Sequence, residues 1–293
     1  MKPNLRIAIS SCPNDTFMFW AMLHRQVNTF RLDFSVEMRD IEQLNRAATE
    51  QEFDVVKISY AHYPKVSQAY QLLTAGSAVG FGNGPLLICR RKKITPDDVP
   101  NLRIAIPGVD TTANMLLTIA YPTATNKKEY LFSDIEEAVL NDEVDAGLLI
   151  HETRYTYAQK KLRKILDMGE YWEKETGLPL PLGAIAVRRK LPDKVKKQIN
   201  AALCESICYA LQNPHLPNDF VLKHAQAIDT NVCRKHIQLY VNEFSVDLGE
   251  KGKQAVEHLF AKGMTAGFFP EVCQPVFVTD LSGFYLYCVR STR

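Results

Sequence analysis

Strand-like and helix-like segments alternate along most of this chain, and this alternation limits the possible fold more than any other feature. A strand over residues 5–10 precedes a helix over about 15–25. An alternating polar and apolar strand over 31–38 precedes a polar helix over 40–50, and a short apolar strand follows at 53–59. This rhythm is typical of an α/β protein with a largely parallel sheet.

The rhythm starts again after a glycine-rich loop over 76–84 and a charged connector over 90–101. Ser133 and Glu136 have the spacing of a capping box, which predicts that a helix opens at Ser133. The expected elements of this part of the chain are strands at 85–89, 102–106, 145–150 and 184–187, and helices at 111–119, from 133, from 192 onward, at 231–244 and at 250–262.

Turn residues near 88–93 and near 182–186 divide the chain into two α/β lobes. We expect lobe 1 to hold residues 1–90 and 186–293, and lobe 2 to hold residues 91–185. Two lobes joined by two hinge crossings place a cleft between them, as in solute-binding proteins, and domain interfaces are favoured ligand sites.

The composition excludes several classes of protein. The chain has 35 basic and 33 acidic residues, a formal net charge of +2, so neither nucleic acid nor an anionic membrane is an expected partner. No apolar run approaches the roughly 20 residues that cross a bilayer. A strand begins near Leu5, where a signal peptide would have its apolar segment, so we expect a cytoplasmic protein.

The seven cysteines are scattered and have no CxxC spacing, and Cys204 and Cys208 lie one helical turn apart. We interpret them as mostly buried thiols in a reducing compartment. The sequence predicts no metal site.

His151 directly follows the apolar residues 147–150, which have the character of the end of a buried strand. Ligands of open α/β sheets bind outside the carboxyl ends of the strands, and histidine can exchange a proton near neutral pH. His151 is therefore a candidate catalytic residue; the alternative is a strand-end histidine satisfied by the backbone. The other histidines lie in polar or helical contexts and are interpreted as surface or capping residues: His24, His62, His215, His224, His236 and His258.

Two loops that lead from a strand into a helix are candidate anion sites. The first spans 10–17 and includes Asn14, and the second spans 107–113 and includes Thr111, Thr112 and Ala113. Free N–H groups at a helix start attract carboxylates and phosphates, and the alternative is helix capping alone. Two adjacent threonines favour a ligand role for the second loop.

Lys57 is unusual within its apolar strand, since lysine is rarely buried without a partner. Its ammonium group either reaches a sheet edge or pairs with a carboxylate. Ser59 ends the same strand and is expected to face the cleft, with the backbone around Ile58 nearby.

A series of motifs in this order resembles the 1,4-dihydroxy-6-naphthoate synthase family of the futalosine route to menaquinone. They are SCPNDTF at 11–17, KISYA at 57–61, GPL at 84–86, PG at 107–108, TTA at 111–113, IHE at 150–152, RYTY at 154–157, TGLPLPLG at 176–183 and YVNEFS at 240–245. The match runs from about residue 5 to 265. The tail after about Gly267, which ends in FYLYC at 284–288, has no counterpart that we can place.

The resemblance implies a type II periplasmic-binding-protein-like fold that has become a cytoplasmic lyase without a cofactor. Its substrate would be a small-molecule carboxylate, cyclic dehypoxanthine futalosine, cleaved to 1,4-dihydroxy-6-naphthoate and a sugar-derived fragment. The family's proposed general base matches His151, and its ligand contacts match residues 57–59, Thr112 and Ala113.

Two other functions are weighed against this one. A non-catalytic protein that binds a small anion would share the fold, but the expected lack of an export signal and the histidine in the cleft argue against it. Chorismate dehydratase of the same pathway resembles the family in fold and size, but the motifs at 150–152 and 178–183 argue against it. The sequence does not predict an oligomeric state. It names Glu152 and Arg154 as candidates for the general acid merely because they neighbour His151.

Overall fold

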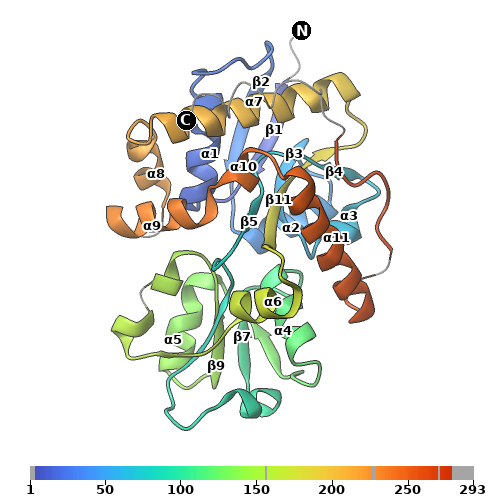
Figure 1. Cartoon of the computed structure of the whole chain (residues 1–293). Helices are drawn as coiled ribbons and strands as arrows, with labels where there is room; N and C mark the ends of the chain where they lie inside the picture. The colour runs from blue at the N-terminus through green and yellow to red at the C-terminus, as the bar shows by residue number, and fades with distance from the viewer. Residues whose placement is uncertain (1–3, 156, 226–228, 270, 279–293) are drawn as a thin grey trace.

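The computed structural model describes residues 4–155, 157–225, 229–269 and 271–278, so the FYLYC segment of the tail lies outside the described residues. The described chain forms an α/β structure with two separate β-sheets. Figure 1 shows them one above the other: the upper half holds both ends of the described chain and the lower half its middle.

The first sheet has the strand order β2-β1-β3-β11-β4, and β5 also pairs with β11. The strands are β1 (Asn4–Ile9), β2 (Asp33–Met38), β3 (Val55–Ser59), β4 (Tyr70–Leu72), β5 (Ala78–Gly80) and β11 (Leu180–Arg188). β1 is parallel to β2 and β3, as the strand–helix rhythm predicts. β11 runs antiparallel to β3, β4 and β5, because the chain returns to this sheet from the other half.

The second sheet has the order β10-β6-β9-β7-β8. Its strands are β6 (Leu86–Cys89), β7 (Ile104–Ile106), β8 (Lys127–Glu129), β9 (Ala146–Leu149) and β10 (Arg163–Asp167). β7 is parallel to β8 and β9, whereas β6 is antiparallel to both of its neighbours. The prediction of a largely parallel sheet is therefore wrong, since each crossing strand enters its sheet against the direction of the strands beside it.

Helices cover the sheets and fill the end of the chain (Figure 1). Their bounds are α1 Pro13–Leu23, α2 Ile41–Thr49, α3 Tyr63–Val66, α4 Thr112–Ala120, α5 Ile135–Leu140, α6 Met168–Thr176, α7 Asp193–Gln212, α8 Asn218–His224, α9 Thr230–Tyr240, α10 Glu243–Val246 and α11 Gly249–Thr265. The predicted helices therefore form, with ends displaced by a few residues.

The capping box predicted at Ser133 is absent from the structure. Helix α5 begins at Ile135, and the Ser133 hydroxyl donates to Asp134 Oδ1 at 2.9 Å. Glu136 is bound instead by Lys160 Nζ at 2.9 Å. The N-cap residue is Asp134 rather than Ser133, so Glu136 does not stand at the third position that a capping box requires, and the prediction is wrong.

By strand pairing, the chain leaves the first sheet after Gly80 and joins the second at Leu86. It returns between the end of α6 at Thr176 and the start of β11 at Leu180. Both passages lie earlier in the sequence than the crossings expected near 88–93 and 182–186. The division into lobes at residues 90 and 185 stays a prediction.

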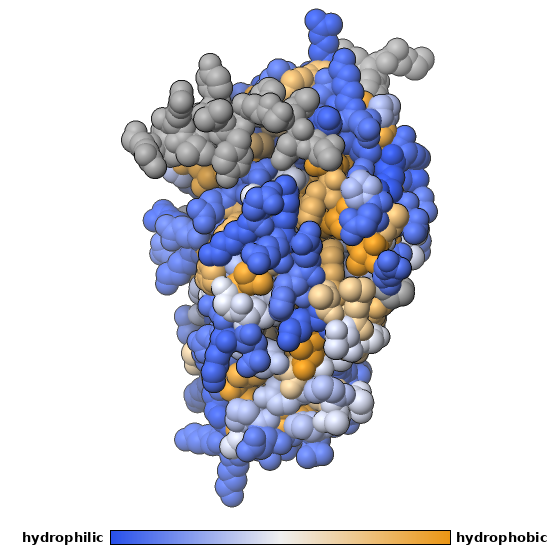
Figure 2. All heavy atoms as spheres, turned by 45° about the vertical axis from the view of Figure 1, so that its right-hand side comes forward, coloured by the Kyte–Doolittle hydropathy of each residue, from blue (hydrophilic) through white to orange (hydrophobic). Residues whose placement is uncertain are grey.

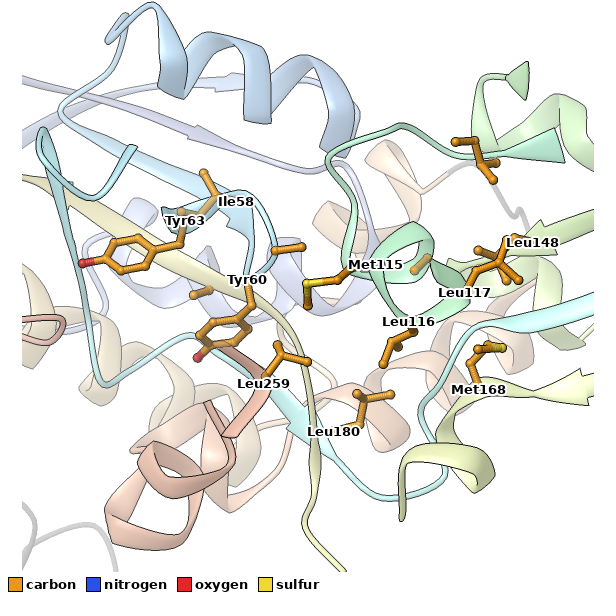
Figure 3. Packing of buried hydrophobic residues seen from close by; sticks show 14 of the residues in the cluster. Ile58, Tyr60, Tyr63, Met115, Leu116, Leu117, Leu148, Met168, Leu180 and Leu259 are labelled. Carbon is orange, nitrogen blue, oxygen red and sulfur yellow. The ribbon is translucent and has the colours of Figure 1, made fainter. Parts of the chain in front are cut away.

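One hydrophobic cluster continues from the first half into the second. Figure 3 shows Tyr60 and Leu259 on one side, Met115 and Leu116 of α4 on the other, and Leu180 of the returning strand with them. Burial of these apolar side chains stabilises the contact between the halves on this side of the molecule.

On the face shown in Figure 2, hydrophilic side chains cover most of the surface, and hydrophobic ones gather in smaller patches between them. Among the helices of the described ranges, none is long and apolar enough to cross a membrane.

Candidate active site

A cavity of about 80 Å³ lies where the two halves meet. Its walls come from the β1–α1 loop and the first turn of α1, the starts of α2 and α4, the end of β3, β5 and the segment that leads to β6, the two residues after β9, the first half of β11 and helix α9. The lining residues are Ser10, Asn14, Asp15, Ile41, Lys57, Ser59, Ala78, Asn83, Pro85, Thr111, Thr112, Ala113, Ile150, His151, Leu182, Gly183, His236 and Tyr240. Segments far apart in the sequence thus meet at one site.

The structure brings most of the predicted site residues to this cavity. They are Asn14, Lys57, Ser59, Thr111, Thr112, Ala113 and His151. Ile58 does not line it, because neighbouring residues on a strand point to opposite faces and its side chain lies in the hydrophobic cluster (Figure 3). A contact between residue 58 and a ligand in this cavity would therefore have to come from the backbone.

Strand β9 ends at Leu149, and the chain turns away from the sheet at His151. It has a left-handed backbone with φ +57° and begins the 3-10 turn His151–Tyr155. Its Nδ1 lies 3.1 Å from Cys12 Sγ, and the ring of Phe132 packs edge-on with its centroid 4.7 Å away. These two contacts fix the imidazole from both halves of the molecule.

The other ring nitrogen of His151 has the properties of a proton acceptor. Nε2 is buried and has no hydrogen-bond partner among the described residues. Burial lowers the pKa of His151 to about 4; Asp15 opposes this shift and Lys57 adds to it. The imidazole is therefore neutral at physiological pH, which is the form that can accept a proton.

Lys57 and Asp15 form a buried ion pair beside the cavity. Lys57 Nζ lies 2.9 Å from Asp15 Oδ1, and the two side chains are 6% and 0% exposed. Ser10 donates to the other carboxylate oxygen from its backbone N at 3.2 Å and from its hydroxyl at 2.7 Å. Of the two alternatives for Lys57, the pairing with a carboxylate is therefore the one that occurs.

Asn14 extends this network to helix α9. Its amide Nδ2 donates to Asp15 Oδ1 at 2.9 Å, and its Oδ1 lies 2.9 Å from His236 Nε2. His236 is completely buried, so its interpretation as a surface or capping residue is wrong. The sequence did contain a signal, because Cys233, His236 and Tyr240 share the i, i+3, i+7 spacing of one buried helix face.

The hydroxyl groups of Thr111 and Thr112 are already engaged. Thr111 caps α4, since its Oγ1 accepts from Asn114 N at 3.2 Å and donates to Gly108 O at 2.8 Å. Thr112 Oγ1 donates to Leu182 O at 2.8 Å and accepts from Ala61 N at 3.2 Å. What remains for a ligand is the backbone of the helix start, where the first N–H groups lack intrahelical partners and the helix dipole favours an anion.

Ser59 is held by the side chain of Asn45. The Ser59 backbone N donates to Asn45 Oδ1 at 2.9 Å, and Asn45 Nδ2 donates to Ser59 Oγ at 3.2 Å. Because its oxygen accepts this bond, the Ser59 hydroxyl hydrogen stays available as a donor to a ligand.

Tyr240 completes the wall on the α9 side, with Arg154 beside it. Tyr240 begins the YVNEFS motif at 240–245, but it was not among the predicted site residues. The Tyr240 hydroxyl donates to Asn83 O at 3.2 Å, and burial raises its pKa to about 12, so it stays protonated. Arg154 Nη1 donates to Gly84 O at 3.0 Å. Among the described residues, no group of three His, Cys, Asp or Glu side chains is arranged to hold a metal ion.

A second contact between the halves lies beside the cavity. His62 Nδ1 of the upper half is 3.1 Å from Asp110 Oδ2 of the lower half, and Lys65 Nζ binds the other oxygen of the same carboxylate. His62 is 1% exposed, so it is not a surface residue; of the two alternatives it has the capping position, at the N-cap of α3, although its side chain makes no capping bond there. Burial on its own would raise the pKa of Asp110, but the bonds from His62 and Lys65 lower it to about 2.

These groups together define what the cavity can do. It offers a neutral imidazole that accepts a proton, a helix start that attracts a carboxylate, and a lysine whose charge is balanced by Asp15. A small organic anion fits this chemistry, and a proton taken from it would pass to His151.

Comparisons with known proteins agree with a biosynthetic enzyme. A family model described as menaquinone biosynthesis matches residues 5–264. A protein of Thermus thermophilus named 1,4-dihydroxy-6-naphtoate synthase is 40% identical over 274 residues, which cover 94% of this chain and 99% of that one. A Streptomyces coelicolor protein of the same name is 40% identical over 272 residues, covering 91% of this chain and 95% of that one.

Solved structures show the same fold. A protein from Archaeoglobus fulgidus superposes with a TM-score of 0.86 at 36% identity, over 91% of this chain and 98% of that one. The alkanesulfonate-binding protein SsuA from Xanthomonas axonopodis, bound to MOPS, superposes with a TM-score of 0.71 at 13% identity, over 94% of this chain and 99% of that one. The predicted periplasmic-binding-protein-like α/β fold is thus confirmed.

Proposed function

The chain belongs to the menaquinone biosynthesis family, and from this premise we propose that it is a carbon–carbon lyase that converts cyclic dehypoxanthine futalosine to 1,4-dihydroxy-6-naphthoate. The reaction would take place in the cytoplasm without a cofactor. The observation that supports it best is the unpartnered Nε2 of a neutral histidine in a cavity that also contains a helix start.

In this proposal, His151 is the general base. Its neutral Nε2 takes a proton from the substrate, and the electron pair released breaks a carbon–carbon bond and completes the aromatic naphthalene ring. General base catalysis typically contributes about 10²–10⁴-fold. The gain from aromatisation and the positioning of the substrate supply the rest of the acceleration.

The carboxylate of the substrate would be held at the start of α4. The backbone N–H groups of Thr112 and Ala113 and the helix dipole favour an anion there. Lys57 and Ser59 line the same cavity, and Asn14 holds the Asp15 carboxylate that pairs with Lys57. In this arrangement Asn14 and Asp15 act on the substrate through Lys57.

Substrate entry requires the halves to separate. Ligand pockets for small organic molecules typically measure about 300–1,000 Å³, whereas this cavity measures about 80 Å³. We infer from this difference that the described arrangement is a closed form. Closure around the substrate would exclude water from the reaction, as lids do in other enzymes.

The test is to incubate the purified protein with cyclic dehypoxanthine futalosine and follow the absorbance of the naphthoate product. We expect turnover by the wild type, a loss of about 10²–10⁴-fold in kcat for His151→Ala, and no loss for His24→Ala, a variant of an exposed histidine. Binding without turnover by the wild type would favour a non-catalytic anion-binding protein. Consumption of chorismate instead would favour a chorismate dehydratase.

A further inference from the structure

We propose that His236 is a second histidine of the active site, and that it binds a hydroxyl group of the substrate through a fixed hydrogen-bond acceptor, Nδ1. This inference rests on the proposed function and adds to it a residue that determines substrate specificity. It is carried by a chain of four side chains, Lys57, Asp15, Asn14 and His236, each of which lines the cavity.

The chain of contacts determines which nitrogen of His236 carries the proton. The Asp15 carboxylate forms an ion pair with Lys57 Nζ, and its Oδ1 also accepts a hydrogen bond from Asn14 Nδ2 at 2.9 Å. A carboxylate can only accept, so the amide of Asn14 must point its NH₂ group toward Asp15 and its oxygen toward His236. The Asn14 oxygen is 2.9 Å from His236 Nε2 and can only accept as well. Nε2 therefore carries the hydrogen.

It follows that Nδ1 of the neutral ring holds a lone pair. This atom is buried and has no hydrogen-bond partner among the described residues. Burial, followed by the positive charges of Arg154 and Lys57, lowers the pKa of His236 well below its usual value, so the ring stays neutral. A buried acceptor left without a partner is costly, and a ligand that donates a hydrogen bond to it would remove that cost.

The neighbours of His236 support a ligand rather than a structural partner. Its ring centroid lies 6.3 Å from that of His151 and 4.5 Å from that of Tyr240, so two imidazoles line one small cavity. The Tyr240 hydroxyl already donates to Asn83 O and is not the missing donor. The sugar-derived part of the proposed substrate carries hydroxyl groups, which can donate to Nδ1.

The two histidines are therefore expected to differ in role. The hydrogen position on His151 depends on Cys12, whose sulfur can donate to Nδ1 or accept from it. The hydrogen position on His236 is set by groups that cannot reverse their roles. His236 thus orients the substrate, while His151 carries out the proton transfer.

Three variants of His236 separate the two ring nitrogens. His236→Gln places an amide near Nε2, which can still donate to Asn14, and removes the acceptor at Nδ1. His236→Asn places an oxygen near Nδ1 and loses the bond to Asn14. His236→Phe removes both the donor and the acceptor.

We expect kcat/KM to fall about tenfold in His236→Gln and His236→Phe, mostly through KM, since one neutral hydrogen bond to the substrate is lost. His236→Asn should recover most of this loss, and His215→Gln, at an exposed histidine, should match the wild type.

A second measurement reports on the hydrogen position directly. Long-range proton–nitrogen NMR of histidine-labelled protein should show Nε2 protonated and Nδ1 unprotonated in His236 throughout the neutral range, and it does not depend on turnover. Unfolding curves of each variant would show whether a loss of activity reflects a loss of folded protein. An active wild type with an equally active His236→Gln, or a protonated Nδ1, would overturn the inference. A wild type without lyase activity would contradict the proposed function itself, and this inference with it.

Discussion

At the scale of single residues, the active site is a set of groups kept in one protonation state. His151 and His236 are neutral because they are buried, and Tyr240 keeps its proton for the same reason. Among the described residues that line the cavity, Lys57 and Asp15 form an ion pair in which the two charges balance. The protonation states of these groups therefore change little across the neutral range. We expect the activity to depend on pH only far from neutrality.

The pH dependence of catalysis tests this arrangement. The proposed base is active when His151 is unprotonated, and its pKa is lowered to about 4. Activity should therefore be constant as the pH falls through the ordinary histidine range and should decline when it approaches about 4. The measurement is kcat/KM against pH, with circular dichroism recorded at each point to exclude unfolding. A decline centred near the ordinary histidine value of about 6.5 would contradict the buried, neutral imidazole.

Individual residues of the site were predictable where chemistry and position coincide. His151 follows a strand end, and Lys57 interrupts an apolar strand, so both stand out in the sequence. Asp15 and His236 do not stand out as site residues. The spacing around His236 indicates only a buried helix face, and the partners Lys57 of Asp15, 42 residues away, and Asn14 of His236, 222 residues away, are determined by the tertiary structure. The left-handed backbone of His151 also has no signal in the sequence.

At the scale of elements, the first passage between the sheets depends on a close approach of two backbones. A Cβ atom on Gly84 would lie 2.1 Å from the backbone N of Gly169, the second residue of α6. Met168 N donates to Pro85 O at 2.9 Å beside this point. The passage and the start of α6 are thus fixed together, which aligns β6 with β10.

Substitution of Gly84 tests this contact. Gly84→Ala should lower the free energy of unfolding by about 1–3 kcal/mol, the usual cost of adding a methyl group where neither backbone can move away. Urea unfolding measures it. Lys174→Ala, at an exposed position of α6, is the control and should change stability by less than about 0.5 kcal/mol. An equal stability of Gly84→Ala and wild type would show that the two backbones separate easily.

The helices could be predicted because their hydrophobic patterns extend over several residues, and the short strands β6, β7 and β9 because each is a continuous apolar run. The strands β8 (KKE) and β10 (RKILD) are largely polar, and β4 and β5 have only three residues each, so these four strands were not predicted. β5 lies within the segment that was interpreted as a glycine-rich loop, and it becomes a strand because β11 pairs with it. The tertiary partner, rather than local sequence, determines these elements.

At the scale of the whole molecule, the two halves are joined on one side by apolar packing and on another by ionic contacts. The hydrophobic cluster in Figure 3 continues through both halves. Asp110 of the lower half binds His62 and Lys65 of the upper half. Polar contacts can exchange with water at little cost, whereas apolar ones cannot. We therefore expect opening to separate the Asp110 side and to leave the cluster intact.

The contribution of Asp110 to stability should depend on pH in a defined window. Its pKa falls from 3.8 to about 2 on folding, so it stabilises the folded state fully above about pH 4, and this contribution is lost as the pH falls toward 2. Asp110→Asn should therefore cost about 2 kcal/mol at neutral pH and almost nothing near pH 2. Unfolding curves of both proteins across this range measure the difference, with Asp97→Asn, an exposed aspartate, as control. A cost that persists near pH 2 would show that the carboxylate charge is not its source.

The position of β11 in the first sheet has a consequence for biosynthesis. This strand separates β3 from β4 in space, yet in the sequence it follows every strand of the second sheet. On the ribosome, the second sheet has all of its strands once residue 167 has emerged, whereas β4 and β5 wait for a neighbour until β11 is translated. The nascent amino-terminal region thus exposes unpaired strand edges while about a hundred further residues are made. At typical elongation rates of about 5–20 residues per second, this takes about 5–20 s.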